Sequence, residues 1–348
     1  MRVKSTGPLG AKIALVGEAP GEQEELTGLP FIGYSGQELS RMLRDAGIDR
    51  QECFISNVFL DRPPGNSVDH FFTTKKEGSL ELPPLKPGKY IKKEFVFEVL
   101  RLRAELAVVK PNLIVTLGGT ATWALLGTGK ISTVRGAIDQ ALLVDGIRCK
   151  VLPTYRPAAV CRQWELRPTV IADLMKALRE SQTPELLLTN REIWIEPSIE
   201  EIWKFISLYI WEAKPLVIGF DIETKKNSQI SCISFAPSNT RALVIPFIDE
   251  RKEDWSYWNR TEEEYAWSAV KTVLESIFPK VGQNGLYDIQ YLWRQYGLRV
   301  NNYLHDTMLL HHSLQPELPK GLGFLGSVYC SERAWKKLRT FEEEKPDE

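Results

Sequence analysis

The chain of 348 residues is longer than one ordinary domain and suits two domains of about 170 residues each. Its 44 basic and 45 acidic residues nearly cancel, which excludes a strongly basic protein whose overall field attracts nucleic acid, so any such partner must bind a local patch. Five scattered cysteines without a C-x-x-C pair argue against a zinc ribbon or a disulfide framework. Because no stretch could span a bilayer, we expect a soluble cytoplasmic protein without a membrane partner.

The stretch from Gly17 to Gly36 carries the strongest functional signal. The short apolar run before it, residues 12–16, predicts a buried parallel strand that delivers Gly17 and Glu18 to its carboxyl end. Open α/β sheets bind their ligands at that edge. Gly-Glu-Ala-Pro-Gly then turns the chain, Gly-Leu-Pro-Phe-Ile-Gly presents Phe31, and Ser35 with Glu38 predicts a capping box for the next helix.

This order of strand, two glycine-rich blocks and helix resembles the first motif of the uracil-DNA glycosylase superfamily, most closely its family 4 branch. The resemblance implies a three-layer α/β/α domain that binds uracil in DNA. It also implies that Gly17 and Gly21 shape the pocket, that Phe31 stacks on the base, and that Glu18 positions or activates the attacking water. The residues alone leave two alternatives: a turn that binds another phosphate through backbone amides, and a Glu18 that is only structural.

Residues 51–58 predict the second strand, which ends at Asn57 and is followed by Arg-Pro-Pro-Gly-Asn. The resemblance implies that the Asn57 amide reads the Watson–Crick edge of uracil, since an amide both donates and accepts hydrogen bonds. The alternative is that Asn57 only caps or turns the chain. Family 4 members usually carry iron–sulfur cysteines before Arg-Pro-Pro, at the N-terminus and near residues 95–98. This chain has Asp61 at the first position and no cysteine at the others, so we predict no iron–sulfur cluster.

The rest of the first domain alternates between predicted strands and helices, as in a doubly wound fold. Residues 66–93 form a lysine-rich insert that reads equally well as a solvated loop and as a flap that contacts phosphates. The remaining predicted elements are a helix over 94–109, a strand over 112–118, a helix over 119–126, a hairpin at Asp145-Gly146, a strand over 151–154 and a helix over 166–180.

The sequence Tyr-Arg-Pro-Ala-Ala-Val-Cys-Arg at 155–162 is similar to the superfamily's second motif, in which a histidine precedes the proline. In the family this histidine stabilises negative charge on uracil O2 while the following loop wedges into the duplex. Arg156 occupies the histidine position here. A guanidinium is permanently charged and can still stabilise a leaving uracil anion, but it cannot act as a neutral donor.

We place the first domain at residues 1–182, a linker at 183–191 and a second domain at 192–348. The strand over 215–224 ends in Asp221 and Glu223, which point to one face because they are two residues apart. Two such carboxylates can share a divalent cation, preferably Mg²⁺ or Mn²⁺. Strands over 231–235 and 241–247 are predicted as antiparallel partners, with helices over 198–211 and 262–278.

Phe-Asp-x-Glu-Thr followed 67 residues later by Asn-x-x-Tyr-Asp resembles the first two motifs of the DEDD 3′–5′ exonucleases, especially the proofreading domain of family A DNA polymerases. The resemblance implies a ribonuclease H-like fold. It makes Asp221, Glu223 and Asp288 catalytic metal ligands, with Asn284 holding the 3′ nucleotide and Asp306 structural. No Tyr-x-x-x-Asp or His-x-x-x-Asp third motif follows, which implies a weak, truncated exonuclease or one that a separate polymerase chain completes.

These motifs together predict a DNA repair or replication protein similar to the front end of phage-type family A polymerases. The main hypothesis is an enzyme that hydrolyses the N-glycosidic bond of uracil in single-stranded or duplex DNA, with metal-dependent 3′–5′ trimming as a second activity. The rival hypothesis is a catalytically weak module that recognises uracil or single strands and escorts a DNA polymerase.

Overall fold

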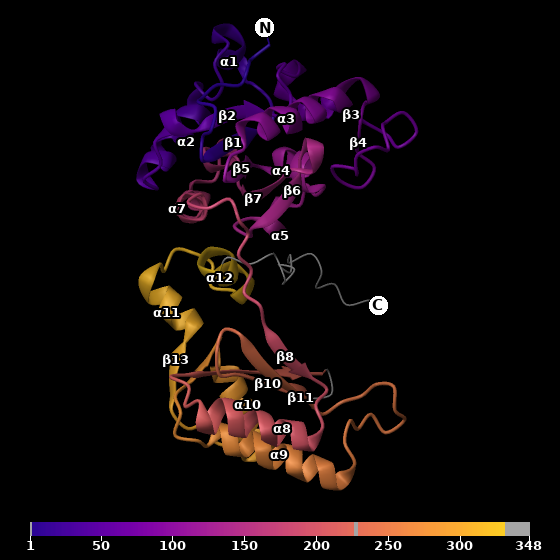
Figure 1. Cartoon of the computed structure of the whole chain (residues 1–348), viewed down its shortest axis with the longest axis vertical. Coiled ribbons are helices and arrows are strands. Elements are labelled where there is room, and N and C mark those ends of the chain that lie inside the picture. The colour runs from indigo at the N-terminus through magenta and orange to yellow at the C-terminus, as the bar shows by residue number, and fades with distance from the viewer. Residues whose placement is uncertain (1, 226–228, 331–348) are drawn as a thin grey trace. The chain divides into compact units, whose positions relative to one another are not determined.

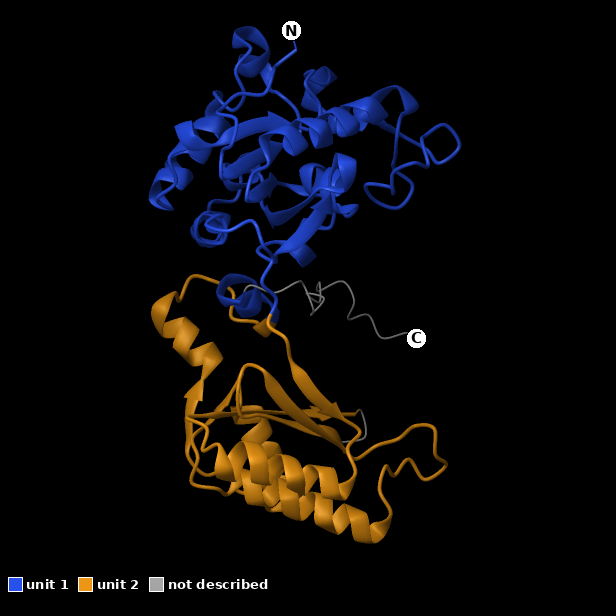
Figure 2. Cartoon of the chain, viewed as in Figure 1, with its two compact units in different colours: residues 1–188, 323–348 blue, residues 189–322 orange. Residues whose placement is uncertain are grey.

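The computed structural model describes residues 2–225 and 229–330, which form two compact units (Figure 2). Unit 1 comprises residues 1–188 and 323–348, and unit 2 comprises residues 189–322. The predicted linker over 183–191 therefore contains the division between the units. Within the described ranges, no helix is long and apolar enough to cross a membrane.

Unit 1 is built on a five-stranded sheet in the order β2-β1-β5-β7-β6 (Figure 1). Four strands are parallel and the edge strand β6 is antiparallel to β7, as the predicted hairpin requires. Gly17 lies opposite Asn57 in the register, so β1 and β2 end side by side. The strands are β1 Ile13–Gly17, β2 Phe54–Asn57, β5 Leu113–Leu117, β6 Asp139–Leu142 and β7 Arg148–Thr154.

Helices cover both faces of this sheet because its inner strands are apolar on both sides. One face packs against helices α2 Tyr34–Asp45 and α7 Arg167–Glu180, and the other against α3 Val96–Val109 and α4 Gly119–Leu126. Leu15 belongs to the first core, whereas Ala14 and Val16 belong to the second. The predicted three-layer α/β/α architecture is confirmed.

Two local features differ from the simplest sequence-based expectation. Helix α2 begins at Tyr34 with Gly33 as its N-cap, so the predicted Ser35–Glu38 capping box is wrong. Glu38 is instead buried and accepts a hydrogen bond from Arg167 at 2.8 Å, which explains its position on the inner side of the helix. The insert over 66–93 is more than a solvated loop, because its strands β3 Phe72–Thr73 and β4 Tyr90–Ile91 pair and bury apolar side chains.

Short elements complete unit 1 and support its loops. They are α1 Glu22–Thr27, α5 Ile131–Val134, α6 Pro157–Val160, α12 Leu322–Tyr329 and the 3₁₀ turns Arg50–Glu52, Pro64–Asn66, Val68–Phe71, Lys93–Phe95, Val144–Gly146 and Trp164–Leu166. Residues 323–330, which follow unit 2 in the sequence, thus pack as part of unit 1.

Unit 2 contains a six-stranded mixed sheet in the order β13-β12-β9-β10-β11-β8 (Figure 1). Strands β9 to β11 are antiparallel, β12 and β13 run parallel to β9, and β8 adds a parallel edge beside β11. Apart from β8, this is the strand order of a ribonuclease H-like fold. The strands are β8 Glu192–Ile195, β9 Ile218–Thr224, β10 Ile230–Ala236, β11 Arg241–Pro246, β12 Lys280–Gly282 and β13 Tyr303–Asp306.

The helices of unit 2 pack on the face of β9 that carries Phe220 and Ile222, and this leaves Asp221 and Glu223 on the opposite, exposed face. The alternation follows directly from the two-residue period of a strand. Helix α8 starts at a capping box formed by Ser198 and Glu201. The helices are α8 Ile199–Ile206, continued by a π-helical turn Ser207–Glu212, then α9 Arg260–Leu274, α10 Leu286–Tyr296 and α11 Thr307–Leu314.

Candidate functional site

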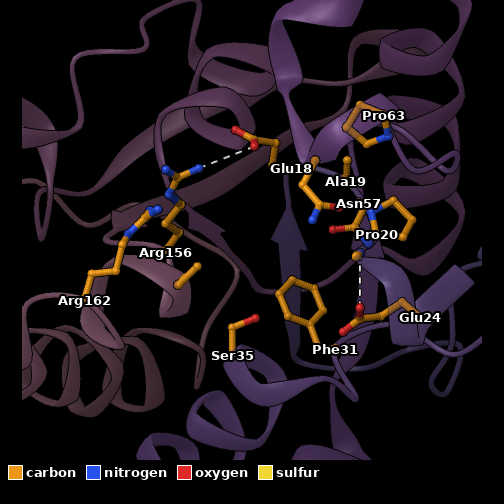
Figure 3. A pocket seen from close by; sticks show the side chains of 13 residues that line it. Glu18, Ala19, Pro20, Glu24, Phe31, Ser35, Asn57, Pro63, Arg156 and Arg162 are labelled. Atoms are coloured by element: carbon orange, nitrogen blue, oxygen red, sulfur yellow. Dashed lines mark hydrogen bonds and ion pairs between the residues drawn. The ribbon is translucent and has the colours of Figure 1, made fainter.

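A cavity of about 320 Å³ opens in unit 1 where strands β1 and β2 end (Figure 3). It contains the side chains that the two glycosylase-like motifs single out, although they are far apart in the sequence. The lining residues are Glu18, Ala19, Pro20, Gly21, Glu24, Phe31, Ser35, Asn57, Pro63, Asn66, Arg156, Ala158 and Arg162.

Gly17, Phe31 and Asn57 meet at the floor of this cavity. A Cβ atom on Gly17 would lie 2.3 Å from Phe31 Cζ and 2.4 Å from Asn57 Oδ1, so only glycine allows this approach. Asn57 is 3% exposed, and its Oδ1 atom is buried without a hydrogen-bond partner in the structure. Buried acceptors are normally paired, so this oxygen marks Asn57 as a lining residue of the cavity whose hydrogen-bonding capacity is not fully used within the protein.

Glu18 and Arg156 both line the cavity, where their side chains point toward each other (Figure 3). Arg156 Nη1 lies 3.4 Å from Glu18 Oε1, and the hydroxyl of Thr120 donates to Glu18 Oε2 at 2.5 Å. The carboxylate is thus held from two sides while it stays partly accessible. The sequence analysis did not identify Thr120. This residue lies at the start of α4, directly after β5, and it reaches Glu18 because β5 lies beside β1 in the sheet.

Two further side chains that the sequence analysis did not assign hold the loop between β1 and α2. Glu24 accepts hydrogen bonds from the backbone amides of Gly21, Ile32 and Gly33 at 2.9–3.1 Å. Arg50 donates to the carbonyls of Pro30 and Phe31 at 2.9 and 2.8 Å. The capping-box spacing from Gly21 to Glu24 is a sequence signal for Glu24, whereas nothing local marks Arg50.

We call these contacts of Glu24 and Arg50 the loop clamp. They hold the backbone in an unusual conformation at Phe31. Phe31 has φ 53°, a left-handed conformation that costs a bulky residue free energy. The carbonyl contacts of Arg50 hold this residue, and burial lowers the pKa of the Arg50 guanidinium. The clamp therefore presents the Phe31 ring to the cavity.

A second cavity, of about 370 Å³, lies against the other side of the Glu18–Arg156 pair. Lys86 and Lys89 from the insert and Lys130 before α5 contribute to its lining. Lys89 forms an ion pair with Asp69. This concentration of positive charge beside the first cavity favours a nearby anion.

The donor set of unit 1 does not fit an iron–sulfur cluster. Burial raises the pKa values of the Cys53 and Cys149 thiols to about 12, and the two residues belong to the cores on opposite faces of the sheet, so they do not share one site. Over residues 2–225 and 229–330, no group of three or more His, Cys, Asp or Glu side chains is placed to hold a metal ion. Asp61 lies near Arg2 instead, with Nε and Oδ2 3.8 Å apart.

The predicted acidic residues of unit 2 lie on β9 and at the start of α10, but within the described residues they do not form a group of three that is placed to hold a metal ion. Asp221 and Glu223 project from the exposed face of β9. Asp288 is buried at the start of α10, where its Oδ1 accepts from the Ile222 amide at 3.2 Å. Burial, with a smaller contribution from the negative charge of Glu223, raises the pKa of Asp288.

Asn284 and Asp306 lie beside these acidic residues in different roles. Asp306 accepts from the backbone amides of Asn284, Gly285 and Met308 at 2.9–3.1 Å and from the Tyr303 hydroxyl at 2.7 Å, so it organises the loop before α10. Asn284 itself is exposed, with φ 57°. Its side chain therefore remains accessible at the same end of the sheet.

Comparison with known proteins identifies unit 1. The model of the uracil DNA glycosylase superfamily matches residues 4–179, and the chain belongs to this superfamily. It is 32% identical to the Type-4 uracil-DNA glycosylase of Thermotoga maritima over 177 residues, which cover 50% of this chain and 80% of the relative. It is 33% identical to the Type-4 uracil-DNA glycosylase of Archaeoglobus fulgidus over 179 residues, which cover 50% and 79%.

A 3′–5′ exonuclease family model matches residues 206–343, which confirms the predicted fusion and places the chain among hydrolases. Solved structures are only weakly similar. The EXD2 exonuclease domain soaked in Mg and dGMP has a TM-score of 0.27 and 19% identity, over 45% of this chain and 78% of that one. Escherichia coli RNase D has a TM-score of 0.29 and 16% identity, over 45% and 36%.

Proposed function

We propose that unit 1 excises uracil from DNA by hydrolysing the N-glycosidic bond. The observation that carries this proposal is the unpaired Oδ1 atom of buried Asn57 next to the Phe31 ring, in a cavity of about 320 Å³. Uracil offers an N3–H donor and an O4 acceptor, which complement the two ends of an amide. The Type-4 uracil-DNA glycosylase names of the relatives support the same substrate.

The proposed reaction begins with a nucleotide that leaves the base stack and enters the cavity. Phe31 stacks on the uracil, and the Asn57 amide binds its edge. Glu18, held by Thr120 and Arg156, positions the water that attacks C1′. As the glycosidic bond breaks, its electron pair passes to the uracil, and Arg156 stabilises the resulting anion. The proton that the water loses as it bonds to C1′ passes to the Glu18 carboxylate and from there to solvent. Gly17 and Gly21 keep the floor and rim free of side chains.

The second cavity supports DNA as the partner of this site. Its lysines lie in a lining that shares Glu18 and Arg156 with the first cavity, so they are placed to contact the backbone of a strand whose base enters that cavity. Lysines bind phosphodiesters as compact point charges. The insert over 66–93 therefore contributes to DNA binding.

One labelled substrate tests the proposal. A 5′-labelled single strand with one central deoxyuridine is incubated with the protein in EDTA or in Mg²⁺ and then treated with hot alkali. We expect cleavage at the uracil in EDTA, and Glu18→Ala should abolish it while changing DNA affinity little. An intact strand that shifts in a gel would favour the rival, a uracil-sensing module that escorts a family A DNA polymerase.

We also propose metal-dependent 3′–5′ exonuclease activity for unit 2. A 3′–5′ exonuclease model matches this part of the sequence, Asp221 and Glu223 share the exposed face of β9, and Asp288 contacts the Ile222 amide between them. These hard oxygen donors suit Mg²⁺ or Mn²⁺, which would activate water and stabilise the leaving 3′ oxygen. Asn284 would hold the 3′ nucleotide. The same labelled strand should give a ladder only in Mg²⁺, and Asp221→Ala should remove it; a ladder that persists in the variant contradicts this assignment.

A further inference from the structure

Charged side chains join the three segments in which family 4 relatives would be expected to place cluster-binding cysteines. Arg2 Nη2 lies 2.5 Å from Glu98 Oε1, and Arg2 Nε lies 3.8 Å from Asp61 Oδ2. The other oxygen of Glu98 accepts from Arg101 Nε at 2.9 Å. The N-terminal segment, the loop after β2 and the start of α3 are thus connected by one chain of ion pairs.

The inner part of this network is buried. Glu98 is only 2% exposed, so its charge would be costly without partners. Arg2 and Arg101 pair with its two carboxylate oxygens. Arg101 Nη1 also lies 2.8 Å from Glu105 Oε2. Because the buried carboxylate is stable only while both cations remain paired with it, the network holds the N-terminal segment and helix α3 in place.

Arg101 extends the network to the base-binding cavity. Its Nη2 donates to the carbonyl oxygens of Asn57 at 2.8 Å and Val58 at 3.0 Å. A planar guanidinium binds two successive carbonyls at a fixed angle, so it fixes the backbone where β2 ends. The amides of Val58 and Phe59, in turn, donate to the carbonyls of Gly17 and Glu18. The Asn57 side chain therefore projects from a backbone that is held on both sides.

We propose that the Arg101 network, defined as Arg2, Asp61, Glu98, Arg101 and Glu105, positions Asn57 in the role that an iron–sulfur cluster would otherwise fill. The site then requires no bound iron. Arg101 is a positioning residue because it contacts the Asn57 backbone and does not line the cavity. This inference rests on uracil excision as the proposed function of unit 1, but its structural part can be measured separately.

The test compares Arg101→Gln with Arg103→Gln on the same helix. Arg103 is matched because it is also partly buried and donates to a backbone carbonyl, that of Ala124, which is not part of the cavity. Both variants should lose stability. Only Arg101→Gln should lower kcat/KM for uracil release per folded molecule, by about tenfold to a hundredfold, since small displacements of a positioning group have effects of that size. Arg101→Lys should restore only part of the rate.

Hydrogen exchange gives a readout that does not need activity. Exchange of the Val58 and Phe59 amides should accelerate in Arg101→Gln and stay at the wild-type rate in Arg103→Gln. If the wild-type protein releases no uracil but this difference appears, the proposed function fails while the network stands. Equal exchange and equal kcat/KM in the two variants would overturn the positioning role.

Metal analysis tests the other half of the inference. The full chain, expressed with ample iron and purified without oxygen, should contain no stoichiometric iron or acid-labile sulfide, and exposure to air should leave uracil release unchanged. Stoichiometric iron and sulfide together with air-sensitive activity would overturn the inference that the network replaces a cluster.

Discussion

At the scale of single residues, the site depends on contacts that leave almost no spare space. The Asn57 acceptor is buried and unpaired, and an unsatisfied buried polar group costs about 1–3 kcal/mol. Under the proposed function, an N–H of the bound base would recover that free energy, and specificity for uracil would follow from the amide rather than from the size of the cavity. Cytosine lacks the N3–H and presents an amino group where uracil has O4, so it would leave the amide mismatched.

Gly17→Ala tests how tightly the floor of the cavity is built. The added methyl group would lie 2.3 Å from Phe31 Cζ and 2.4 Å from Asn57 Oδ1, so the ring and the amide must both move. Because displacements of about 1 Å reduce rates on the order of a hundredfold, we expect at least that loss in kcat/KM for uracil release. Single-turnover cleavage of uracil-containing DNA measures it.

Gly321→Ala is the matched control, since a Cβ atom there meets no atom within 4 Å and the residue does not have a positive φ. It should keep the wild-type rate. If Gly17→Ala also cleaves at the wild-type rate, the close packing of Gly17, Phe31 and Asn57 does not set the geometry of the reaction.

At the scale of elements, the loop between β1 and α2 is held by charged side chains in addition to the packing of Phe31 against an apolar core. Glu24 collects three amides and Arg50 two carbonyls, so one carboxylate and one guanidinium determine where Phe31 lies. These hydrogen bonds offset the cost of the left-handed conformation at Phe31, which is of order 1–3 kcal/mol. Without them, only the packing of the Phe31 ring against the core would oppose relaxation of the loop.

Glu24→Gln should therefore weaken this loop. The amide of glutamine keeps one acceptor oxygen, while its NH₂ group would face backbone donors that the carboxylate now accepts from. We expect roughly tenfold slower uracil release and faster backbone exchange over residues 29–33, since hydrogen bonds to charged groups contribute about 1.5–3 kcal/mol. Glu22→Gln on the same short helix, whose side chain is 71% exposed, should behave as wild type. Equal rates in the two variants would contradict the clamp.

We expect the lysines that line the second cavity to contribute to the salt dependence of DNA binding. Lys86→Gln combined with Lys130→Gln removes two cations from the second cavity, so the slope of log K against log[salt] should fall by about 1.4 for a single strand. Lys75→Gln with Lys76→Gln removes two exposed cations of the same insert that do not line the cavity, and the slope should change less. Fluorescence anisotropy with Glu18→Ala as the background measures binding without turnover. An equal change in both pairs would show that only the total charge matters.

At the scale of the whole molecule, the sequence predicts what depends on local pattern. Apolar runs identified the parallel strands of unit 1, and the i, i+2 spacing placed Asp221 and Glu223 on one face of β9. The capping box at Ser35 failed because Glu38 is used instead by Arg167, which lies 129 residues away. Arg50 and Thr120 were missed for the same reason, and so were the contacts of Arg101 with the Asn57 backbone, since these partners are brought together only by the fold. The pairs of Arg101 with Glu98 and Glu105 are local, three and four residues apart on α3.

A long-range contact of this kind joins residues 323–330 to helix α7 within unit 1. Lys176 Nζ donates to the carbonyls of Gly136, Ser327 and Cys330 at 2.5–2.8 Å, so one ammonium group ends α12 and ties it to helix α7. Lys176 is 1% exposed, and burial lowers its pKa from 10.5 to about 8. Its three acceptors satisfy the protonated amine, but they do not remove the cost of its desolvation.

This lowered pKa gives a pH dependence with a defined sign. Between about pH 8 and pH 10.5 the unfolded chain retains a proton on Lys176 that the folded chain has lost, so stability rises with pH in that window, by at most about 3 kcal/mol. Lys176→Met cannot titrate. The difference in unfolding free energy between wild type and Lys176→Met, measured with urea, should therefore shift toward the wild type from pH 7.5 to pH 10. Titrating groups that do not interact with Lys176 are common to both proteins and cancel, while its charged neighbours Asp173 and Glu180 stay ionised throughout this pH range. A pH-independent difference would therefore mean that Lys176 keeps its ordinary pKa and that the end of α12 is not buried against it.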